Sequence, residues 1–466
     1  MTRDVDALIV GGGVVGAVMA SLLIERGLVE PRRVALIDER LAPPPGIEED
    51  WDLRVVAVGR ASQRLLEVIG VWPKLPRDRV CPYERMCVWD ASGRAGDALG
   101  PGSRSRWGSG SGSGSRSGSR GRGSIRFDAA DLGEPNLGSI VESRALQRTC
   151  LEAAMGAGVL MMEARVTRLE MPPSPGSAEG SSALGNAGGG SRVRVRLHDG
   201  RELDTGLLLA ADGVDSRTRD LLRIETATHA YHQDALVAHV RTERPHQDTA
   251  WQRFLPTGPL AFLPLSDGRC SIVWSLVRHE AERLRVLDAA AFGAALTEAS
   301  DGVLGAVEVT TPIVSFPLRL QHAERYVTAR AVLLGDAAHA VHPLAGQGLN
   351  LGLLDCAVLA EILSEARSGG GRAGLADAAS LRRYERRRRS ENLLAAAALD
   401  GLERLFSNTH PLAARLRAFG LEAVGHAAPL RNHLARRALG LAGDVPAFLR
   451  TDPASSPKAD PAWRRR

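Results

Sequence analysis

The sequence predicts an α/β protein in which a Rossmann-like domain is interleaved with a mostly antiparallel β-sheet domain and followed by C-terminal helices. Three observations support this class. A glycine-rich turn joins a strand to a helix near the N-terminus, and far along the chain a second apolar strand ends in Gly335 and Asp336. Between residues 235 and 317 the hydrophobic pattern changes to that of successive strands with alternating faces, interrupted by one short helical segment.

The composition is that of an ordinary globular protein. The chain has 466 residues, of which 44% are hydrophobic and 24% are charged, and its net charge is +5. This length allows two or three domains or one large interleaved fold. A mildly basic balance is more often surface charge than a binding site for an acidic partner. The five cysteines lack C-x-x-C spacing, which favours a reduced cytoplasmic setting and argues against a disulfide framework or a metal site.

The apolar run from residue 7 to residue 24 resembles a signal segment or a membrane span. Acidic Asp4 and Asp6 precede it, however, and glycines interrupt it. A signal segment would instead begin with basic residues and end at a cleavage-type boundary. We therefore expect a soluble protein and interpret this run as a buried strand, turn and helix.

The turn in this run carries a dinucleotide-binding fingerprint. Gly11, Gly13 and Gly16 form G-x-G-x-x-G directly after a strand and at a helix start. The first glycine allows the tight turn, the second lets a pyrophosphate approach the backbone, and the third lets the helix pack on the strand. The next strand ends at Asp38, where a carboxylate would hold a ribose hydroxyl pair. The same glycine spacing recurs at residues 369–374, but no strand precedes it, and we interpret it as a loop.

The segment from Gly335 to Leu354 predicts a second ligand-binding turn. Asp336 lies at the tip of an apolar strand, where it can accept hydrogen bonds from a polyol. Gly346 and Gly348 let the backbone come close to a ligand, because neither carries a Cβ. A helix that begins near Leu349 and runs to about residue 366 would direct its free N–H groups at that ligand and stabilise negative charge there.

Two further positions are ambiguous on the residues alone. Arg54 precedes a predicted short turn and an amphipathic helix, and a solvated surface charge is the usual role of such an arginine. Asp212 and Gly213 follow an apolar strand, and most Asp-Gly pairs are simply turns.

Three segments lie outside the predicted sheets. The Gly/Ser/Arg tract at 101–124 cannot form a core and is expected to be a flexible cationic insertion, and 172–191 reads as a lengthened hairpin loop. Because Trp107 offers the tract little stacking surface, we predict no nucleic-acid binding. The basic run at 381–392 lies on a predicted helix whose charged face is expected to meet solvent, lipid head groups or an acidic partner.

Taken together, the motifs resemble a known family. GGGVVG with Asp38, AADGVDSRTR and LLGDAAHAVHPLAGQGLNLG occur in that order. This set resembles the class A flavoprotein monooxygenases, which have the para-hydroxybenzoate hydroxylase fold. DLRVVAVGRASQRLLEVIGVW and LRRYERRRRSENLLAAAALDGLERLF are similar to segments of the ubiquinone-biosynthesis aromatic hydroxylases, especially the 2-polyprenylphenol and polyprenyl-methoxy-benzoquinol hydroxylases.

The resemblance implies a glutathione-reductase-type, Rossmann-like FAD-binding domain. It would be discontinuous and consist of residues 1–75, 125–230 and 325–380. The substrate-binding β-sheet domain would consist of residues 76–100 and 231–324. Residues 101–124 would be the insertion, and residues 381–450 the C-terminal helical region.

The resemblance also implies roles for particular residues. The three fingerprint glycines would cradle the FAD pyrophosphate and Asp38, where the family usually has Glu, would hold the adenosine ribose. Asp336 would bind the ribityl chain, Pro343 would lie beside the isoalloxazine, and the helix start would donate N–H groups to the pyrimidine end of the flavin. The full set of implied FAD contacts is Gly11, Gly13, Gly16, Asp38, Arg54, Asp212, Gly213, Asp336, Pro343, Gly348, Leu349 and Asn350. No catalytic base is assigned, and His339 and His342 are interpreted as structural.

The implied reaction is hydroxylation of the aromatic ring of a polyprenylated phenol or quinol in ubiquinone biosynthesis. NAD(P)H would bind transiently and reduce FAD, and O2 would react to give a C4a-hydroperoxyflavin that a dry, apolar sheet protects. One alternative is an FAD-dependent reductase or dehydrogenase of a prenyl lipid. Another is a non-catalytic flavoprotein partner in a quinone-biosynthesis complex. We expect a homo-oligomer in the cytoplasm, with peripheral contact at the inner membrane as a further possibility.

Overall fold

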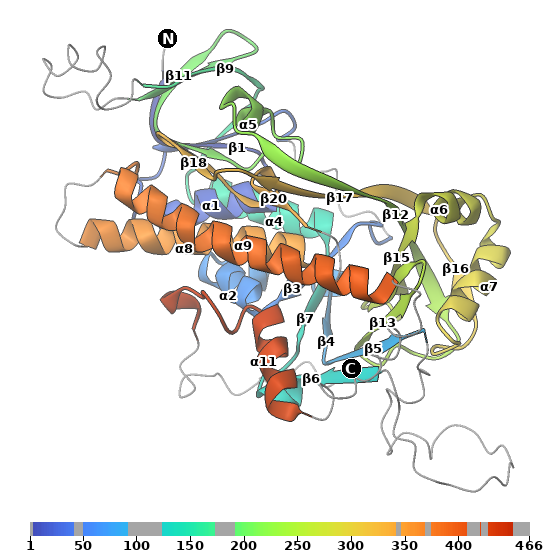
Figure 1. Cartoon of the computed structure of the whole chain (residues 1–466). Helices are drawn as coiled ribbons and strands as arrows, with labels where there is room; N and C mark the ends of the chain where they lie inside the picture. Colours follow the sequence, from blue (N-terminus) through green and yellow to red (C-terminus); the bar gives the residue numbers. More distant parts are fainter. Residues whose placement is uncertain are drawn as a thin grey trace, which may run out of the picture.

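The computed structural model describes residues 3–41, 50–91, 124–172, 192–341, 346–368, 374–407, 420 and 427–450. This part of the chain forms three sheets with helices packed against them (Figure 1). The mixed α/β architecture agrees with the class predicted from the sequence.

The first sheet carries the N-terminal glycine turn. Its central strand, β1 (Arg3–Val10), pairs in parallel with β2 (Val34–Asp38) on one side and with β11 (Glu202–Ala210) on the other. The other members are β8 (Leu160–Glu163), β9 (Val166–Glu170), β10 (Val193–Leu197), β18 (Val327–Thr328) and β19 (Ala331–Leu333). Because β1, β2, β11 and β19 are parallel, their carboxyl ends meet at one edge of the sheet, which is where ligands bind in such folds.

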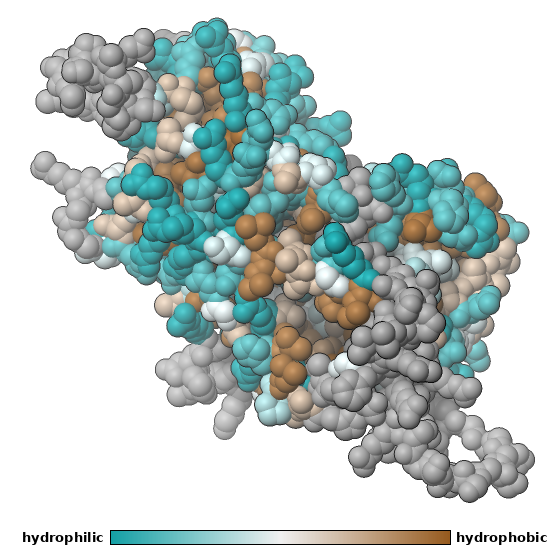
Figure 2. Space-filling view, in the orientation of Figure 1, coloured by the Kyte–Doolittle hydropathy of each residue, from teal (hydrophilic) through white to brown (hydrophobic). Residues whose placement is uncertain are grey.

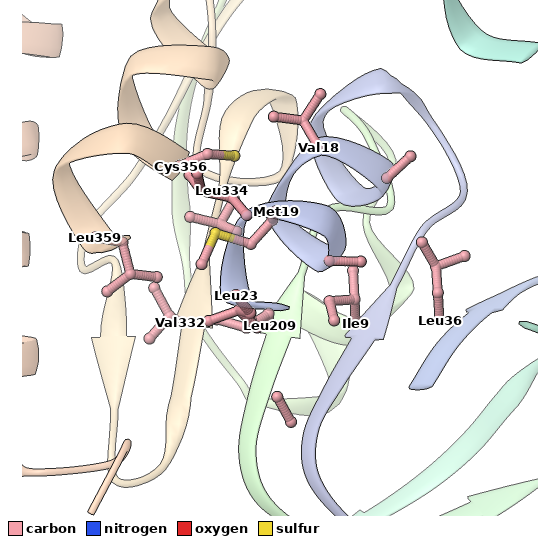
Figure 3. Packing of buried hydrophobic residues seen from close by; sticks show 14 of the residues in the cluster. Ile9, Val18, Met19, Leu23, Leu36, Leu209, Val332, Leu334, Cys356 and Leu359 are labelled. Atoms are coloured by element: carbon pink, nitrogen blue, oxygen red, sulfur yellow. The ribbon is translucent and has the colours of Figure 1, made fainter. Parts of the chain in front are cut away.

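Helix α1 (Val14–Glu25) explains the apolar N-terminal run. It lies between the first sheet and helix α8 (Gln347–Ser368), so almost every side of it is covered. Figure 3 shows Met19 of α1 near Cys356 and Leu334, and Leu23 near Val332 and Leu209; all six side chains are buried. A helix buried on all sides is apolar all round, so its sequence resembles a membrane span without being one.

The second sheet forms a separate layer and is mostly antiparallel, as predicted. The one parallel pair in its described strands is β5 with β13. Its order is β20-β17-β12-β15-β14-β13-β5-β6, with β16 beside β12. The strands are β5 (Arg85–Asp90), β6 (Ser124–Asp128), β12 (Thr226–Thr242), β13 (Thr249–Leu255), β14 (Gly258–Pro264), β15 (Cys270–Val277), β16 (Val307–Val309), β17 (Val314–Ala323) and β20 (His339–Ala340).

Helices pack on both faces of this second sheet. Helices α6 (Arg278–Arg285) and α7 (Ala289–Ala299) pack on one face, against buried residues that include Ile272, Trp274 and Phe262 (Figure 1). Strand residues between these point the other way. The opposite face is therefore directed away from α6 and α7, and the end of the long C-terminal helix lies against Phe254 of β13 on that face.

A small third sheet connects the two larger ones. It consists of β3 (Val55–Gly59), β7 (Gly138–Glu142) and β4 (Val80–Tyr83). Helix α2 (Arg60–Val68) follows β3, and α4 (Ser143–Gly156) follows β7. The short turn predicted directly after Arg54 was wrong, because the chain continues there as strand β3 before α2 begins.

The C-terminal region is helical. Helix α9 (Ala378–Ser407) lies against α8 and extends towards the second sheet, and α11 (Ala428–Ala438) packs near β6 (Figure 1). The expectation that the basic run of α9 is a solvated face needs correction, because Arg388 is buried, with only 2% of its side chain exposed. The hairpin loop and the Gly/Ser/Arg tract lie outside the described residues, except at their edges, and the domain boundaries remain predictions.

The surface that carries α9 is mainly hydrophilic, with scattered apolar side chains (Figure 2). The exposed large apolar residues of α9 and α11 are Leu393, Leu394, Leu402, Leu405, Leu430 and Leu434. Among the described residues, no helix is both long enough and apolar enough to cross a bilayer.

Candidate functional site

The glycine turn between β1 and α1 has the geometry that its sequence predicts. Gly11 has φ +112°, and its N–H donates to the carbonyl of Ile37 (2.7 Å). A Cβ on Gly11 would overlap the carbonyl of Ala211, and one on Gly16 would overlap the carbonyl of Gly11. Both glycines are therefore required by the close approach of backbone segments.

Gly13 differs from these two glycines, because a Cβ added there would meet no atom of the described residues within 4 Å. It is the N-cap residue of α1, and no side chain caps that helix start. The first N–H groups of α1 thus point into open space with the positive end of the helix dipole behind them. This is a cradle suited to an anion such as a pyrophosphate.

Asp38 lies at the end of β2, beside this cradle. Its Oδ2 accepts a hydrogen bond from the N–H of Gly12 (2.6 Å), and its Oδ1 accepts one from the backbone N–H of Arg40 (2.9 Å). Gln147 of α4 holds the same turn by donating to the carbonyl of Gly12 (3.0 Å). Each oxygen of a carboxylate has a second lone pair, so Asp38 retains acceptor capacity for ribose hydroxyls.

The Gly335 turn lies close to the glycine turn, although more than 300 residues separate them in the sequence. Gly335 has φ +56°, and a Cβ there would come within 3.2 Å of the Val15 side chain in α1. A Cβ on Gly352 of α8 would come within 2.9 Å of Val15 and 3.0 Å of the Gly335 Cα. The starts of α1 and α8 and the Gly335 turn therefore meet at one crossing.

Asp336 projects from this turn and is exposed. Surrounding protein atoms nevertheless displace part of the water around its carboxyl, and this desolvation raises the pKa of that group. The positive charges of His339 and Arg54 oppose the rise. A Cβ on Gly348 would lie 3.9 Å from Asp336 Oδ1 and within 4 Å of no other atom in the described part of the chain. Arg54, Asp336 and Gly348 are thus gathered at the start of α8.

Asn350 attaches the start of α8 to strand β3. Its Oδ1 accepts from the N–H of Gly59 (2.9 Å), and its Nδ2 donates to the carbonyls of Ala57 (2.8 Å) and Gly346 (3.2 Å). The family resemblance assigns the backbone N–H of Asn350 to the flavin. Its side chain has a separate role, because it fixes the helix start relative to the strand that follows Arg54.

Asp212 and Gly213 form the third turn of the predicted set. Asp212 accepts hydrogen bonds from the hydroxyl of Ser216 and from the N–H of Thr218 (2.9 Å), so it organises the start of the short helix α5 (Arg217–Leu221). From this loop, Arg219 donates to the carbonyl of Ala337 (3.1 Å), next to Asp336. Gly213 has φ +83°, and among the residues that the structure describes a Cβ there would meet no atom within 4 Å. The three predicted turns are thus adjacent, whereas Pro343 and His342 lie outside the described residues.

Comparison with known proteins identifies the family. A model described as an FAD binding domain matches residues 178–396. Ubiquinone hydroxylase UbiL of Rhodospirillum rubrum is 35% identical over 453 residues, covering 96% of this chain and 93% of that protein. The 3-demethoxyubiquinol 3-hydroxylase of Escherichia coli is 32% identical, covering 94% of this chain and 99% of that protein. The chain belongs to the family of FAD-dependent ubiquinone-biosynthesis hydroxylases.

Solved structures agree on the fold of this hydroxylase family member. PqsL of P. aeruginosa, solved with 2-aminobenzoylacetate, superposes with a TM-score of 0.67 at 21% identity, covering 90% of this chain and 100% of that one. The p-nitrophenol 4-monooxygenase PnpA of Pseudomonas putida gives a TM-score of 0.67 at 15% identity, covering 95% and 100%. The predicted family, fold class and enzyme class, an FAD-dependent monooxygenase, are thereby confirmed.

The geometry of the hydroxylase site fits FAD. The open space at Gly13 suits a pyrophosphate, and Asp38 retains acceptor capacity for a ribose. The exposed Asp336 faces the opening at Gly348, where hydroxyls of a ribityl chain would find an acceptor. The start of α8 supplies N–H groups and a dipole suited to the charge of a reduced flavin.

Sequence reasoning missed a buried polar network behind the Gly335 turn of the hydroxylase. Asp355 of α8 is fully buried and bonded to His339, whose Nε2 lies 2.6 Å from Asp355 Oδ2. Burial acts to raise the pKa of Asp355, but His339 and Arg388 outweigh it and hold the pKa well below its usual range. His339 was interpreted as structural, and its buried position is consistent with that.

The sequence did contain a signal for this network. Asp355 is the single acidic residue within the apolar segment 347–360 of α8. On α9, Arg388 and Asn392 continue the helical spacing of the buried Leu381 and Tyr384, so they share the inward face. Polar residues at core positions of two facing helices predict a paired buried cluster.

Proposed function

We propose that this hydroxylase binds FAD across the three adjacent turns and hydroxylates the aromatic ring of a polyprenylated phenol or quinol, using NAD(P)H and O2. The observation that carries the proposal is the meeting of α1, α8 and the Gly335 turn at one crossing, with Asp212, Asp336 and Gly13 around it. The relatives, a ubiquinone hydroxylase and a 3-demethoxyubiquinol 3-hydroxylase, support the substrate class. The reductant rests on the family resemblance.

When bound, FAD supplies the redox and oxygen chemistry, and the protein supplies position, charge and exclusion of water. Gly13 and the start of α1 would receive the pyrophosphate, and Asp38 the adenosine ribose. Asp336 would orient the ribityl chain, and Gly348 and Leu349 would present backbone N–H groups that stabilise negative charge. Arg54 would add positive charge on the same side. Asp212 and Gly213 would close the site from the β11 end, and Pro343 is assigned to the flavin side by resemblance alone.

The face of the second sheet opposite α6 and α7 supports an apolar substrate region. Ala261 and Val273 alternate with buried residues that face α6 and α7, and both are partly buried. Leu263, on the same face, packs on the cluster that also receives Val55 and Ala57 of β3. This face is thus directed towards the start of α8, where an apolar wall would keep water from the reacting groups.

The decisive experiment uses the purified protein with FAD, NAD(P)H and a short-chain prenylphenol. We expect a flavin absorption spectrum, O2 uptake that depends on the phenol, and a product heavier by one oxygen atom. Flavin reduction without an oxygenated product would instead support the reductase or dehydrogenase alternative. Absence of bound or bindable flavin would rule the proposal out.

A substitution on this face of the sheet tests whether its apolar side chains keep water from the reacting groups. Val273→Asn places a polar group on the face opposite α6 and α7, and we expect a larger share of the consumed NAD(P)H to yield hydrogen peroxide instead of hydroxylated product. Val286→Asn, at a position that is 75% exposed, is the matched control and should leave the product yield unchanged. Equal yields in both variants would contradict a substrate region on this face.

We also propose peripheral contact with a membrane surface, because the substrate class is a prenyl lipid. The exposed leucines of α11, Leu430 and Leu434, lie on a helix that carries Arg431, Arg436 and Arg437. Apolar side chains beside arginines favour an anionic bilayer surface. Flotation with vesicles containing anionic phospholipid should retain the protein, and Leu430→Ser with Leu434→Ser should reduce retention; flotation unaffected by the change would exclude this helix. A homo-oligomer or a quinone-biosynthesis complex stays a prediction.

A further inference from the structure

The strongest feature not used by the proposed function is the carboxylate of Asp355. It is fully buried in α8 and accepts four hydrogen bonds. Gly335 N–H (3.0 Å) and His339 Nε2 (2.6 Å) bond to Oδ2, while Arg388 Nε (2.7 Å) and Asn392 Nδ2 (3.1 Å) bond to Oδ1. One oxygen therefore faces the Gly335 turn, and the other faces α9.

The two hydrogen bonds to Oδ2 come from residues on either side of Asp336 in the sequence. Gly335 precedes Asp336 directly, and His339 follows it by three residues, so the carboxylate fixes both ends of the segment that projects Asp336. Gly335 has φ +56°, a conformation that an anchored N–H helps to hold. The ring of Tyr326 stacks on His339 with centroids 5.9 Å apart, which restricts the imidazole further.

The bonds to Oδ1 come from the C-terminal helix α9. Arg388 also donates to Asn392 Oδ1 (2.8 Å) and the carbonyl of Leu351 (3.4 Å), and its side chain is only 2% exposed. Tyr384, one turn earlier on α9, donates to the carbonyl of Leu333 (3.0 Å) in the strand that leads into the turn. Helix α9 thus contacts the segment that carries Asp336 in two ways, through Arg388 and Asp355 and through Tyr384 and Leu333.

We propose that Asp355 and Arg388 are positioning residues that hold Asp336 and the Gly335 turn in the orientation that binds FAD. The inference rests on the proposed function. Burying an ion pair costs more than burying apolar side chains of the same volume, so the pair is a poor device for stability alone. Its four directed hydrogen bonds instead specify one geometry for the turn.

The test separates positioning from stability by comparing three variants. In Asp355→Asn and Arg388→Met, one charge is left buried without its partner, so both single variants should melt at lower temperature. The double variant removes both charges and should regain much of that loss, because an amide at 355 can still accept from Gly335. Such a pattern is the signature of a coupled pair in a double-mutant cycle.

The readout is FAD affinity of the apoprotein, measured by quenching of flavin fluorescence, beside the melting temperature of the same apoprotein. We expect the double variant to bind FAD about tenfold to a hundredfold more weakly than the wild type, as the loss of directed hydrogen bonds around a charged group implies. Arg387→Met is the matched control: Arg387 neighbours Arg388 but pairs with Glu361 and Asp444, so FAD affinity should be unchanged.

Each outcome decides a different claim. Wild-type FAD affinity in the double variant would overturn the positioning role and leave the pair a packing feature. If the single variants do not fold, the double variant still gives the answer; if it also fails to fold, the pair is required for folding itself and the positioning role is rejected. Failure of the wild-type apoprotein to bind FAD would instead overturn the proposed function.

Discussion

Gly13 and Gly16 belong to one motif, yet the structure gives them different physical tasks. A Cβ at position 16 would overlap the carbonyl of Gly11, whereas a Cβ at position 13 would meet no described atom within 4 Å. Gly16→Ala should therefore destabilise the apoprotein by about 2 kcal/mol or more, because backbone must move. Gly13→Ala should leave the melting temperature of the apoprotein nearly unchanged.

Although Gly13→Ala should leave the stability of the apoprotein nearly unchanged, it should weaken FAD binding. The methyl group of Gly13→Ala would enter the space offered to the pyrophosphate, so we expect FAD to bind about tenfold more weakly or worse. Titration of the folded apoprotein with FAD measures this directly. Unchanged affinity in folded Gly13→Ala would show that no pyrophosphate lies there.

His322 predicts a pH dependence of stability. Burial, followed by the charges of His339 and Arg389, lowers its pKa from 6.5 to about 4. The unfolded chain therefore binds the proton more tightly than the folded chain, and stability should fall as the pH decreases from about 6.5 to about 4. Because the ring is partly exposed, we expect His322 to contribute a loss of about 2 kcal/mol, less than the full shift implies.

Urea unfolding of the wild type and of His322→Gln at several pH values checks this expectation. The two curves should converge towards pH 4, because the variant lacks the group that must gain a proton. His239 and His246 also have lowered pKa values, caused mainly by burial, but they are present in both proteins and cancel in the difference. A constant difference between pH 7 and pH 4 would refute the assignment to His322.

At this scale the turns that bring the predicted site residues together were easier to predict from the sequence than the residues that support those turns. The glycine spacing and Asp38 are local patterns, so their arrangement can be read from adjacent residues. Asp355 and Arg388 are 33 residues apart on different helices, and their pairing depends on how α8 and α9 cross. A linear pattern identifies a polar residue on a buried face but does not give its partner.

Among the elements, the start of α8 depends on its attachment to β3 through Asn350. Asn350→Ala removes three hydrogen bonds and leaves the N–H of Gly59 and the carbonyl of Ala57 without this partner. We expect the free energy of unfolding to fall by about 2 to 3 kcal/mol, the cost of leaving buried backbone groups unsatisfied. Denaturant unfolding of the apoprotein measures the change.

Ser364→Ala is the control within the same helix. The hydroxyl of Ser364 bonds only to the carbonyl of Ala360, one turn earlier, as is usual for serine inside a helix. Its removal should change stability by less than about 0.5 kcal/mol. Equal losses in the two variants would mean that Asn350 has no special role in fixing the helix start.

The elements show where sequence patterns are informative and where they fail. Helix α8 was predicted to run to about residue 366 and ends at Ser368, because an apolar segment of that length has a clear period. Strand β3 was missed because five residues, all small or β-branched, lie directly before a strongly amphipathic helix. Its strand conformation comes from pairing with β7, a contact that lies more than 80 residues away in the sequence.

For the whole molecule, the interleaving of two sheets was predictable but their connection was not. The change of hydrophobic pattern near residue 235 indicated a second, antiparallel sheet. The pairing of β20 with β17, which joins the segment after Asp336 to that sheet, involves only two residue pairs and leaves no periodic signal. The contact of α9 with the second sheet likewise depends on tertiary packing.

The contact between α9 and the second sheet predicts which side chain of the C-terminal helix matters for stability. Phe406 near the end of α9 stacks on Phe254 of β13, with ring centroids 4.0 Å apart, and both rings are more than 90% buried. Phe406→Ala should lower the free energy of unfolding by about 3 kcal/mol through lost burial and a residual cavity. Leu402→Ala, at a position that is 44% exposed, should cost less than about 0.5 kcal/mol.

The same pair of variants tests whether α9 serves the second sheet and the Gly335 turn independently. Phe406 lies five helical turns beyond Arg388, so its loss should alter the sheet face without moving Asp336. We therefore expect Phe406→Ala to raise the KM for the phenol while FAD affinity stays at the wild-type value. A loss of FAD affinity in the same variant would show instead that a change at the end of α9 also displaces the Gly335 turn.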